Sequence, residues 1–219
     1  MTRTALETLS ETADAQHQRV LVDNGSGDGG VMAGLLSEFL RIENSDCLVN
    51  HPRNEAVSRC WNDAILNYAM GDMILLLNND VVFQRKGWVG MLADAARRPG
   101  IGAAGSRVLS WNGQTFLEGS FLAFRKEAAL AIAENGQIFD EQFTFTCEDV
   151  DFSRRILKSG LDLGVADIEG QGYVKHLGHG TMSWSNHDGG WNGVSILDVM
   201  HENRLKFCRK WGLPDRVDD

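Results

Sequence analysis

The sequence has no apolar run long enough to cross a membrane. A transmembrane helix needs about 20 consecutive apolar residues, and no stretch of this 219-residue chain approaches that length. The N-terminus also lacks the basic and then apolar layout of a secretory signal peptide. These two absences predict a cytoplasmic protein, and they leave peripheral contact with the inner face of a membrane open.

Paired cysteines and a basic surface are also missing. The four cysteines form no Cys-x-x-Cys pair and no zinc-like spacing, so we expect free thiols in a reducing compartment. The net charge is -9, which argues against nucleic acid as a partner. An acidic protein that handles an anionic substrate needs a metal ion or a local basic patch, so the charge favours a metal site.

Neither common phosphate-binding glycine motif is present. The glycine-rich residues 23–30 follow a short apolar strand at 20–22, but they match neither Gly-x-Gly-x-x-Gly nor the Gly-Lys-Ser/Thr ending of a P-loop. Such a loop can still turn tightly and bring backbone N–H groups near an anion. A generic strand-to-helix turn and a ligand-binding loop therefore stay equally open.

The most informative stretch that is present is an apolar run at residues 73–77, followed by Asn78, Asn79 and Asp80. It predicts a strand buried on both faces, as central strands of parallel sheets are. Its polar end falls at the carboxyl edge of the strand, where open α/β sheets bind ligands. The amide and carboxylate oxygens suit a hard divalent cation that carries phosphates. The alternative is a plain Asn-Asn-Asp turn.

Hydrophobic periodicity predicts a doubly wound α/β fold for the single domain 1–219, in which the strand–helix rhythm runs to residue 105 and breaks after it. The expected helices are 3–17, 54–69, 87–97, 125–134, 148–159 and 195–210. The expected strands are 20–22, 73–77, 101–105 and 161–165, with a hairpin or mixed-sheet segment within 108–124.

Several motifs follow one another in a recognisable order. They are Val22-Asp23-Asn24-Gly25-Ser26, Asn62 within a helix, Leu77-Asn78-Asn79-Asp80, Glu118-Gly119-Ser120, Phe139-Asp140-Glu141, Glu148-Asp149-Val150-Asp151 with Arg155 and Gly160, and His176. In this order the chain resembles the family-2 glycosyltransferases of the GT-A fold, in the rhamnosyltransferase-like branch, from about residue 18 to 211. The resemblance implies a Rossmann-like, mostly parallel sheet flanked by helices, with a smaller mixed acceptor-side portion. It also implies a nucleotide-binding half at 1–105 and an acceptor and catalytic half at 106–219.

The resemblance also implies a function. It is the inverting, metal-dependent transfer of a sugar from a nucleotide diphosphate-sugar to a hydroxyl of a glycan, lipid-linked or other acceptor, in polysaccharide or glycoconjugate synthesis. The residues that match the family's site are Asp149 as the catalytic base with Glu148 beside it, Asp80 and His176 as ligands of Mn²⁺ or Mg²⁺, and Asp23, Asn24, Asn62, Asn78, Asn79 and Gly119 around the donor. Asn78 replaces the first Asp of the family's Asp-x-Asp motif, which removes one charge.

Two C-terminal segments have open interpretations. The Gly-, Trp- and His-rich loop 178–193 matches the family's acceptor-side segment, where Trp184 and Trp191 would stack on sugar rings; a surface loop is the equal alternative. The basic face of the helix at 195–210 is expected to be solvated, with contact to a membrane surface as the minority interpretation.

The family's usual first strand has no match here. Members begin with a strand of the type apolar-apolar-Ile-Pro-x-Tyr-Asn, whereas the residues after Met1 match only the helix that follows it. We therefore expect a sheet one strand short, a strand supplied by another segment, a second copy or a partner chain, or a natural or accidental truncation of the polypeptide. The alternative function is a catalytically inactive homologue that acts as a binding or scaffold protein. A nucleotidyltransferase or retaining transferase is a third hypothesis, against which the Glu148-Asp149 pair argues.

Overall fold

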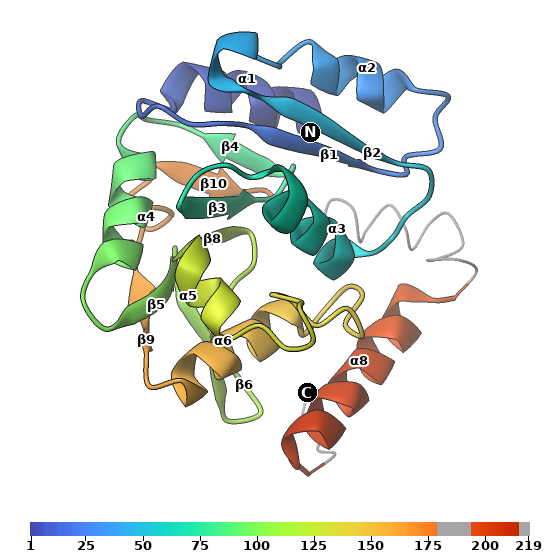
Figure 1. The fold of residues 1–219 in the computed structure, drawn as a ribbon, viewed down its shortest axis with the longest axis vertical. Coiled ribbons are helices and arrows are strands. Elements are labelled where there is room, and N and C mark those ends of the chain that lie inside the picture. Colours follow the sequence, from blue (N-terminus) through green and yellow to red (C-terminus); the bar gives the residue numbers. More distant parts are fainter. Residues whose placement is uncertain (179–193, 215–219) are drawn as a thin grey trace.

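The computed structural model describes residues 1–178 and 194–214, in which helices and short strands alternate along the chain (Figure 1). The strands are β1 (Val20–Asn24), β2 (Cys47–His51), β3 (Met73–Leu77), β4 (Val81–Phe83), β5 (Ile101–Gly105), β6 (Val108–Trp111), β7 (Gln114–Leu117), β8 (Phe121–Arg125), β9 (Asp162–Val165) and β10 (Val174–His176). The helices are α1 (Thr2–Thr12), α2 (Val31–Ser37), α3 (Val57–Asp63), α4 (Trp88–Arg97), α5 (Lys126–Ala131), α6 (Glu148–Lys158) and α8 (Ile196–Trp211), with a 3₁₀ turn η1 (Ile42–Asn44) and a π turn η2 (Ala64–Tyr68).

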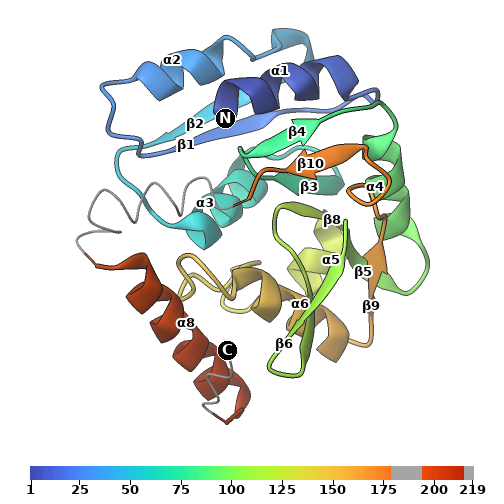
Figure 2. The ribbon, with the colours of Figure 1, turned by 180° about the vertical axis from the view of Figure 1, so that it is seen from behind.

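The strands form several small sheets instead of the continuous, mostly parallel sheet that the sequence predicted. The largest has the order β3-β8-β5-β9. Within it β8 runs antiparallel to both β3 and β5, and β5 and β9 are parallel. β1 and β2 form a separate parallel pair, and β4 pairs antiparallel with β10 (Figure 2). The fold class is α/β as expected, but the sheet is mixed and divided.

β3 is not the central, doubly buried strand that its apolar run predicted. Its side chains alternate between buried and half-buried, and β8 is its one sheet neighbour within the described residues. β8 and β5 take the two inner positions of this sheet. The β8 residues Phe121 and Ala123 pack into a core cluster with α4, whereas Leu122 and Phe124 pack into a second cluster with α6. β3 is apolar throughout and β8 is apolar up to Arg125, so composition could not show that β8 would lie inside and β3 at the edge.

β1 and β3 belong to different sheets. The side chain of Gln18, which precedes β1, connects the two strands where they begin. Its Nε2 donates hydrogen bonds to the carbonyls of Ser45 (2.8 Å) and Tyr68 (3.2 Å), and its Oε1 accepts one from the backbone N–H of Met70 (2.9 Å). The Gln18 side chain thus connects the beginnings of β1 and β3 by hydrogen bonds, although no described strand lies between them and pairs with both.

The predicted helices are present, with shifted ends. Trp88, Leu92 and Ala95 of α4 point inward and are at most 1% exposed, as their spacing indicated. The first helix ends at Thr12 instead of residue 17, and the second begins at Val57 instead of residue 54. The elements α2, β2, β4 and β10 were not anticipated, because each is short and carries little periodicity.

Two expectations drawn from absences can be compared with the structure. The four cysteines are not joined by disulfides, and Cys60, Cys147 and Cys208 are buried. Across residues 1–178 and 194–214, no helix combines the length and the apolar character that crossing a membrane requires.

Candidate functional site

Asp80 and His176 come together because β4 and β10 pair. The antiparallel register sets His176 opposite Val81, next to Asp80, and the backbone N–H of Leu177 donates to the Asp80 carbonyl (2.9 Å). The His176 ring Nε2 then lies 3.1 Å from Asp80 Oδ1. Both side chains are largely buried, with 14% and 8% of their surfaces exposed. The two residues predicted as metal ligands therefore share one position at the carboxyl end of β3.

Two further carboxylates approach His176. Glu118 Oε1 lies 3.7 Å from the ring Nδ1, and Glu169 Oε1 accepts a hydrogen bond from the backbone N–H of His176 (3.2 Å). The hydrogen bond with Asp80 is the main cause that raises the pKa of His176, and the charges of Glu118 and Glu169 add to it. Neither glutamate was assigned to the metal site from the sequence, although Glu118 is part of the Glu-Gly-Ser motif.

Asp149 lies in the first turn of α6 and is held by two backbone donors. Its Oδ2 accepts a hydrogen bond from the N–H of Gly119 (3.1 Å), and its Oδ1 accepts one from the N–H of Val150 (2.8 Å). A Cβ on residue 119 would lie 3.6 Å from Asp149 Oδ2 and 3.0 Å from Trp61 Cη2, so a larger residue would press against the Trp61 ring. The turn 118–120 thus has Glu118 against the imidazole of His176 and Gly119 against the carboxylate of Asp149.

The carboxyl groups of Glu148 and Asp149 are neighbours, with Glu148 buried and Asp149 half-buried. Burial raises the pKa of both, and the charge of Asp149 raises that of Glu148 further. Two N–H donors stabilise a negative charge on Asp149, whereas Glu148 Oε2 is buried without a hydrogen-bond partner in the described part of the chain. The proton that the pair keeps near neutral pH therefore belongs on Glu148, which leaves Asp149 ionised.

We expect Glu148→Gln to make the protein more stable than wild type above pH 8, with little difference at pH 5. Burial raises the pKa of Glu148 from its ordinary value of 4.5 to about 8. The protonated Glu148 therefore leaves the free energy of unfolding of wild type at its full value below pH 4.5. Part of that free energy is lost as the pH rises from 4.5 to about 8, because the buried carboxyl group must then ionise. Glutamine carries no charge, so it avoids this loss of a few kcal/mol.

Melting temperatures at pH 5 and pH 8.5 check this prediction. Glu127→Gln is the matched control, because Glu127 is an exposed glutamate in the first turn of α5. A difference between Glu148→Gln and wild type that stays constant with pH, as the control's should, would contradict the assignment.

Asp23 and Asn24 organise the turn after β1. Asp23 is buried, and its Oδ1 accepts hydrogen bonds from the N–H (3.1 Å) and hydroxyl (2.6 Å) of Ser26. Asn24 Oδ1 accepts one from the N–H of Glu55 (2.8 Å). Gly25 has φ +68°, and a Cβ there would meet the backbone of the 53–54 segment at 2.1 Å. These hydrogen bonds and the close approach at Gly25 fix the conformation of the turn. Its contacts with a nucleotide stay a prediction.

The remaining asparagines have protein partners. Asn62 is 3% exposed and exchanges two hydrogen bonds with the backbone of Phe139, at 2.7 and 2.9 Å. The N–H of Asn78 donates to the Ser120 carbonyl (3.3 Å), and Asn79 Nδ2 donates to Thr2 Oγ1 (3.2 Å). Asn62 therefore fixes α3 to a loop, while Asn78 fixes β3 to the turn 118–120. Trp184 and Trp191 lie outside the described residues.

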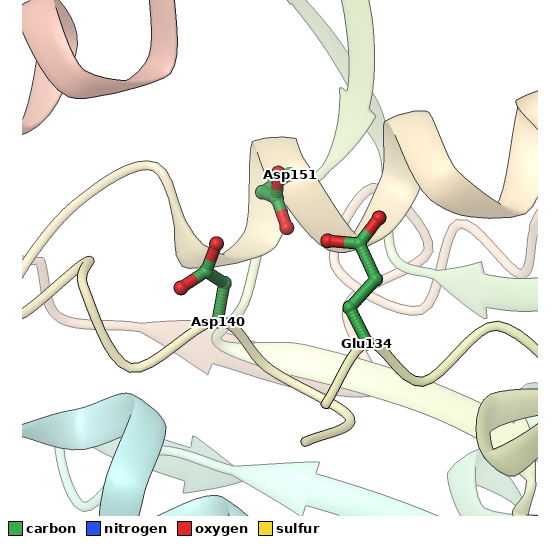
Figure 3. Close-up of side chains that lie close together, drawn as sticks. All are labelled: Glu134, Asp140 and Asp151. Atoms are coloured by element: carbon green, nitrogen blue, oxygen red, sulfur yellow. The ribbon is translucent and has the colours of Figure 1, made fainter. Parts of the chain in front are cut away.

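A second acidic group lies elsewhere, between the α5–α6 connection and α6. Glu134, Asp140 and Asp151 point their carboxylates toward one another, with ligand atoms within 4.8 Å (Figure 3). Such a group could hold a metal ion, but Lys210 of α8 places its Nζ 2.7, 2.8 and 2.9 Å from the three carboxylates. The position that a cation would take is therefore filled by an ammonium group.

This contact corrects one expectation. The basic face of the last helix was expected to be solvated, but the Lys210 side chain is 17% exposed and pairs with three acids. The reason is that Asp151 is buried on α6 and packs against α8, and a buried carboxylate needs counter-charges. Arg155 also pairs with Asp151, with its Nε 2.9 Å from Oδ2.

Comparison with solved structures assigns the fold to a class: it is the fold of glycosyltransferases. The mannosyltransferase PcManGT from Pyrobaculum calidifontis, solved with GDP-Man and Mn²⁺, matches 94% of this chain with a TM-score of 0.61 and 16% identity. GalNAc-T7, solved with UDP, GalNAc and Mn²⁺, matches 73% with a TM-score of 0.58 and 12% identity. TarS of S. aureus matches 94% with a TM-score of 0.54 and 14% identity.

Sequence comparison adds less. No family model matches the chain. The uncharacterized protein y4gI of Sinorhizobium fredii (strain NBRC 101917 / NGR234) is 32% identical over 105 residues, which is 46% of this chain and 11% of that protein. The chain also spans 59%, 38% and 37% of the lengths of the three structures. It therefore corresponds to part of each protein it resembles.

Proposed function

We propose that the protein is a glycosyltransferase that transfers a sugar from a nucleotide diphosphate-sugar to an acceptor hydroxyl with inversion at the anomeric carbon. The observation that carries the proposal is the turn 118–120. One side of it contacts the Asp80–His176 pair, and the other contacts Asp149. A cation-binding pair and a carboxylate base are thus held in one place by a short segment. The glycosyltransferase fold supports the same function.

The geometry of Asp80 and His176 fits a divalent cation. An octahedral ion with bonds of about 2.1 Å holds neighbouring ligand atoms about 3 Å apart, and Asp80 Oδ1 and His176 Nε2 are 3.1 Å apart. Mn²⁺ or Mg²⁺ bound there would act as a Lewis acid that neutralises charge on the departing diphosphate. Asn78 in place of a carboxylate leaves fewer negative ligands, so we infer a moderate affinity in the absence of the donor.

Asp149 is placed to act as the general base. Two N–H donors orient its carboxylate. Because the proton of the pair lies on Glu148, Asp149 stays ionised and can accept a proton. The base would take the proton from the acceptor hydroxyl as that oxygen attacks the anomeric carbon. Direct attack from the face opposite the leaving group inverts the anomeric configuration. Gly119, which the resemblance associates with the donor sugar, places no side chain beside this carboxylate, and a Cβ there would lie 3.6 Å from Asp149 Oδ2.

The finer features of the proposal rest on the resemblance and the site together. They are a rhamnosyltransferase-like branch of family 2, a role in polysaccharide or glycoconjugate synthesis, and an acceptor that is a glycan, a lipid-linked sugar or another hydroxyl compound. The inactive scaffold remains the second candidate, because β1 and β3 share no sheet among the described residues.

Binding of a nucleotide diphosphate with Mn²⁺ should raise the melting temperature by about 5–10 °C. A ligand at a hundred times its Kd adds ~2.7 kcal/mol to stability, and 1 kcal/mol shifts the melting temperature by roughly 2–4 °C at this chain length. A thermal-shift panel of UDP, GDP, dTDP and CDP, each with Mn²⁺, with Mg²⁺ and with EDTA, measures the effect and identifies the base.

Asp80→Ala should abolish the metal-dependent part of the shift. Asp94→Ala is the control, because Asp94 is an exposed aspartate on α4. No shift with any nucleotide would favour the scaffold over the enzyme. A shift that survives Asp80→Ala would place the metal elsewhere.

A further inference from the structure

We propose that Glu118 is the positioning residue of the metal site, which orients the His176 imidazole by accepting a hydrogen bond from its Nδ1–H. The inference rests on the proposed function, because it concerns the metal ligand of that site. It adds a residue and a role that neither the motif order nor the comparisons assign.

The two ring nitrogens of His176 face two different carboxylates. Nε2 faces Asp80 at 3.1 Å, and Nδ1 faces Glu118 at 3.7 Å. A ring whose Nε2 binds a cation must carry its proton on Nδ1, and a metal-bound histidine typically donates that proton to a carboxylate or carbonyl. Among the contacts of the described residues, the side chain that meets Nδ1 is Glu118. Its 3.7 Å separation is longer than a hydrogen bond, and a small side-chain rotation would close it.

An ion pair with Arg107 holds the Glu118 carboxylate near the His176 imidazole and away from the position of the cation. The Arg107 Nε and Nη2 lie 2.9 and 2.8 Å from Glu118 Oε2, which leaves Oε1 directed at the imidazole. The guanidinium therefore fixes one carboxylate oxygen, and the other serves the ring. The Glu118 side chain is 23% exposed, so it is neither buried among apolar groups nor free in solvent.

The backbone supports the same arrangement from both sides. Glu118 precedes Gly119, whose N–H is bound by Asp149, and the Ser120 carbonyl accepts from Asn78. Glu118 is therefore fixed relative to both halves of the site. A change at residue 118 should alter the orientation of His176 without removing any proposed ligand.

The test compares Mn²⁺ binding by wild type, Glu118→Ala and Glu118→Gln, measured by EPR titration of free Mn²⁺ without nucleotide. Loss of a carboxylate behind a ligating histidine typically costs 10–100-fold in metal affinity, and we expect this loss for Glu118→Ala. Glu118→Gln keeps an acceptor oxygen, so it should recover most of the affinity. Glu169→Gln is the matched control, because it removes an equal charge beside His176 but contacts the backbone N–H instead of the ring. Its affinity should change less than threefold.

A second measurement separates orientation from charge. The ¹H and ¹⁵N shifts of the His176 Nδ1–H in the Mg²⁺-loaded protein should report a hydrogen bond to a carboxylate in wild type and the loss of that hydrogen bond in Glu118→Ala. Unchanged affinity in Glu118→Ala, or an equal loss in Glu169→Gln, overturns the proposal, as does an unaltered ring signal. If Asp80→Ala and His176→Ala also leave Mn²⁺ affinity unchanged, the proposed metal site itself is wrong, which is a different result.

Discussion

Replacing Asp149 by asparagine should lower the rate of sugar transfer by about 10²–10⁴-fold, the usual contribution of a positioned general base. Asparagine has nearly the same shape and can still accept a hydrogen bond from the N–H of Gly119, but it cannot take a proton from an acceptor hydroxyl. Binding of the donor nucleotide should be unchanged, because Asp149 does not belong to the metal pair. The loss should therefore appear in kcat and not in the thermal shift.

The measurement is the initial rate of nucleotide diphosphate release with the donor that the thermal-shift panel identifies. Asp94→Asn, the same change at an exposed position on α4, is the control and should keep wild-type activity. NMR of the product tests the inversion, since a retained anomeric configuration would exclude direct displacement. An Asp149→Asn variant within tenfold of wild type would mean that another group accepts the proton.

The pH dependence of the rate provides a further check on the same residue. Activity should fall on the acid side as Asp149 takes up a proton, and the raised pKa of Asp149 moves that limb above the range of an ordinary aspartate. The pH–rate profile of wild type measures this limb. Because Glu148 and Asp149 titrate together, the profile describes the pair.

Replacing Lys210 by methionine should destabilise the fold by about 3–5 kcal/mol, the usual cost of removing one partner from a buried ion pair. Lys210 contacts three carboxylates, and that of Asp151 is completely buried. Methionine removes the charge, and with it the contact of Lys210 Nζ over the ring of Trp211, 5.5 Å from the ring centroid. The three acids would then repel one another, with Arg155 as the remaining buried counter-charge.

Urea denaturation of the two proteins measures the difference. Arg209→Met is the matched control, because its ion pair with Glu202 is 62% and 51% exposed and such pairs contribute about 0–1 kcal/mol. Added Ca²⁺ or Mn²⁺ should restore part of the stability of Lys210→Met, since the three carboxylates lie as metal ligands do. A loss below 1 kcal/mol would mean that α8 is fixed by its apolar contacts alone.

Much of the fold could be predicted from local patterns. The helices α4, α6 and α8 were predicted because their apolar residues recur at helical spacing, and Gly160 ends α6 with φ +84°. The hairpin β6–β7 was predicted because turn residues interrupt a run of β formers. These signals act within a few residues, so the sequence carries them directly. Segments without periodicity, such as β4 and β10, gave no such signal.

The candidate site was predictable in part for the same reason. Asp80, Asp149 and His176 could be named because each belongs to a short motif. Their spatial relation could not be derived from spacing, because it depends on the pairing of β4 with β10. Lys210 was expected to be solvated because a basic residue on a helix normally is. The three carboxylates that it contacts lie far from it in the sequence, so no local pattern indicates them.

By itself, the sequence determined the class of fold, the order of the elements and the residue types available for chemistry. Tertiary structure decided which strands lie inside the sheet, which acids meet Lys210, and that the turn 118–120 contacts both His176 and Asp149. The physical reason is that secondary structure follows from neighbours along the chain. Strand order, burial and the surroundings of a charge depend on residues far apart in sequence.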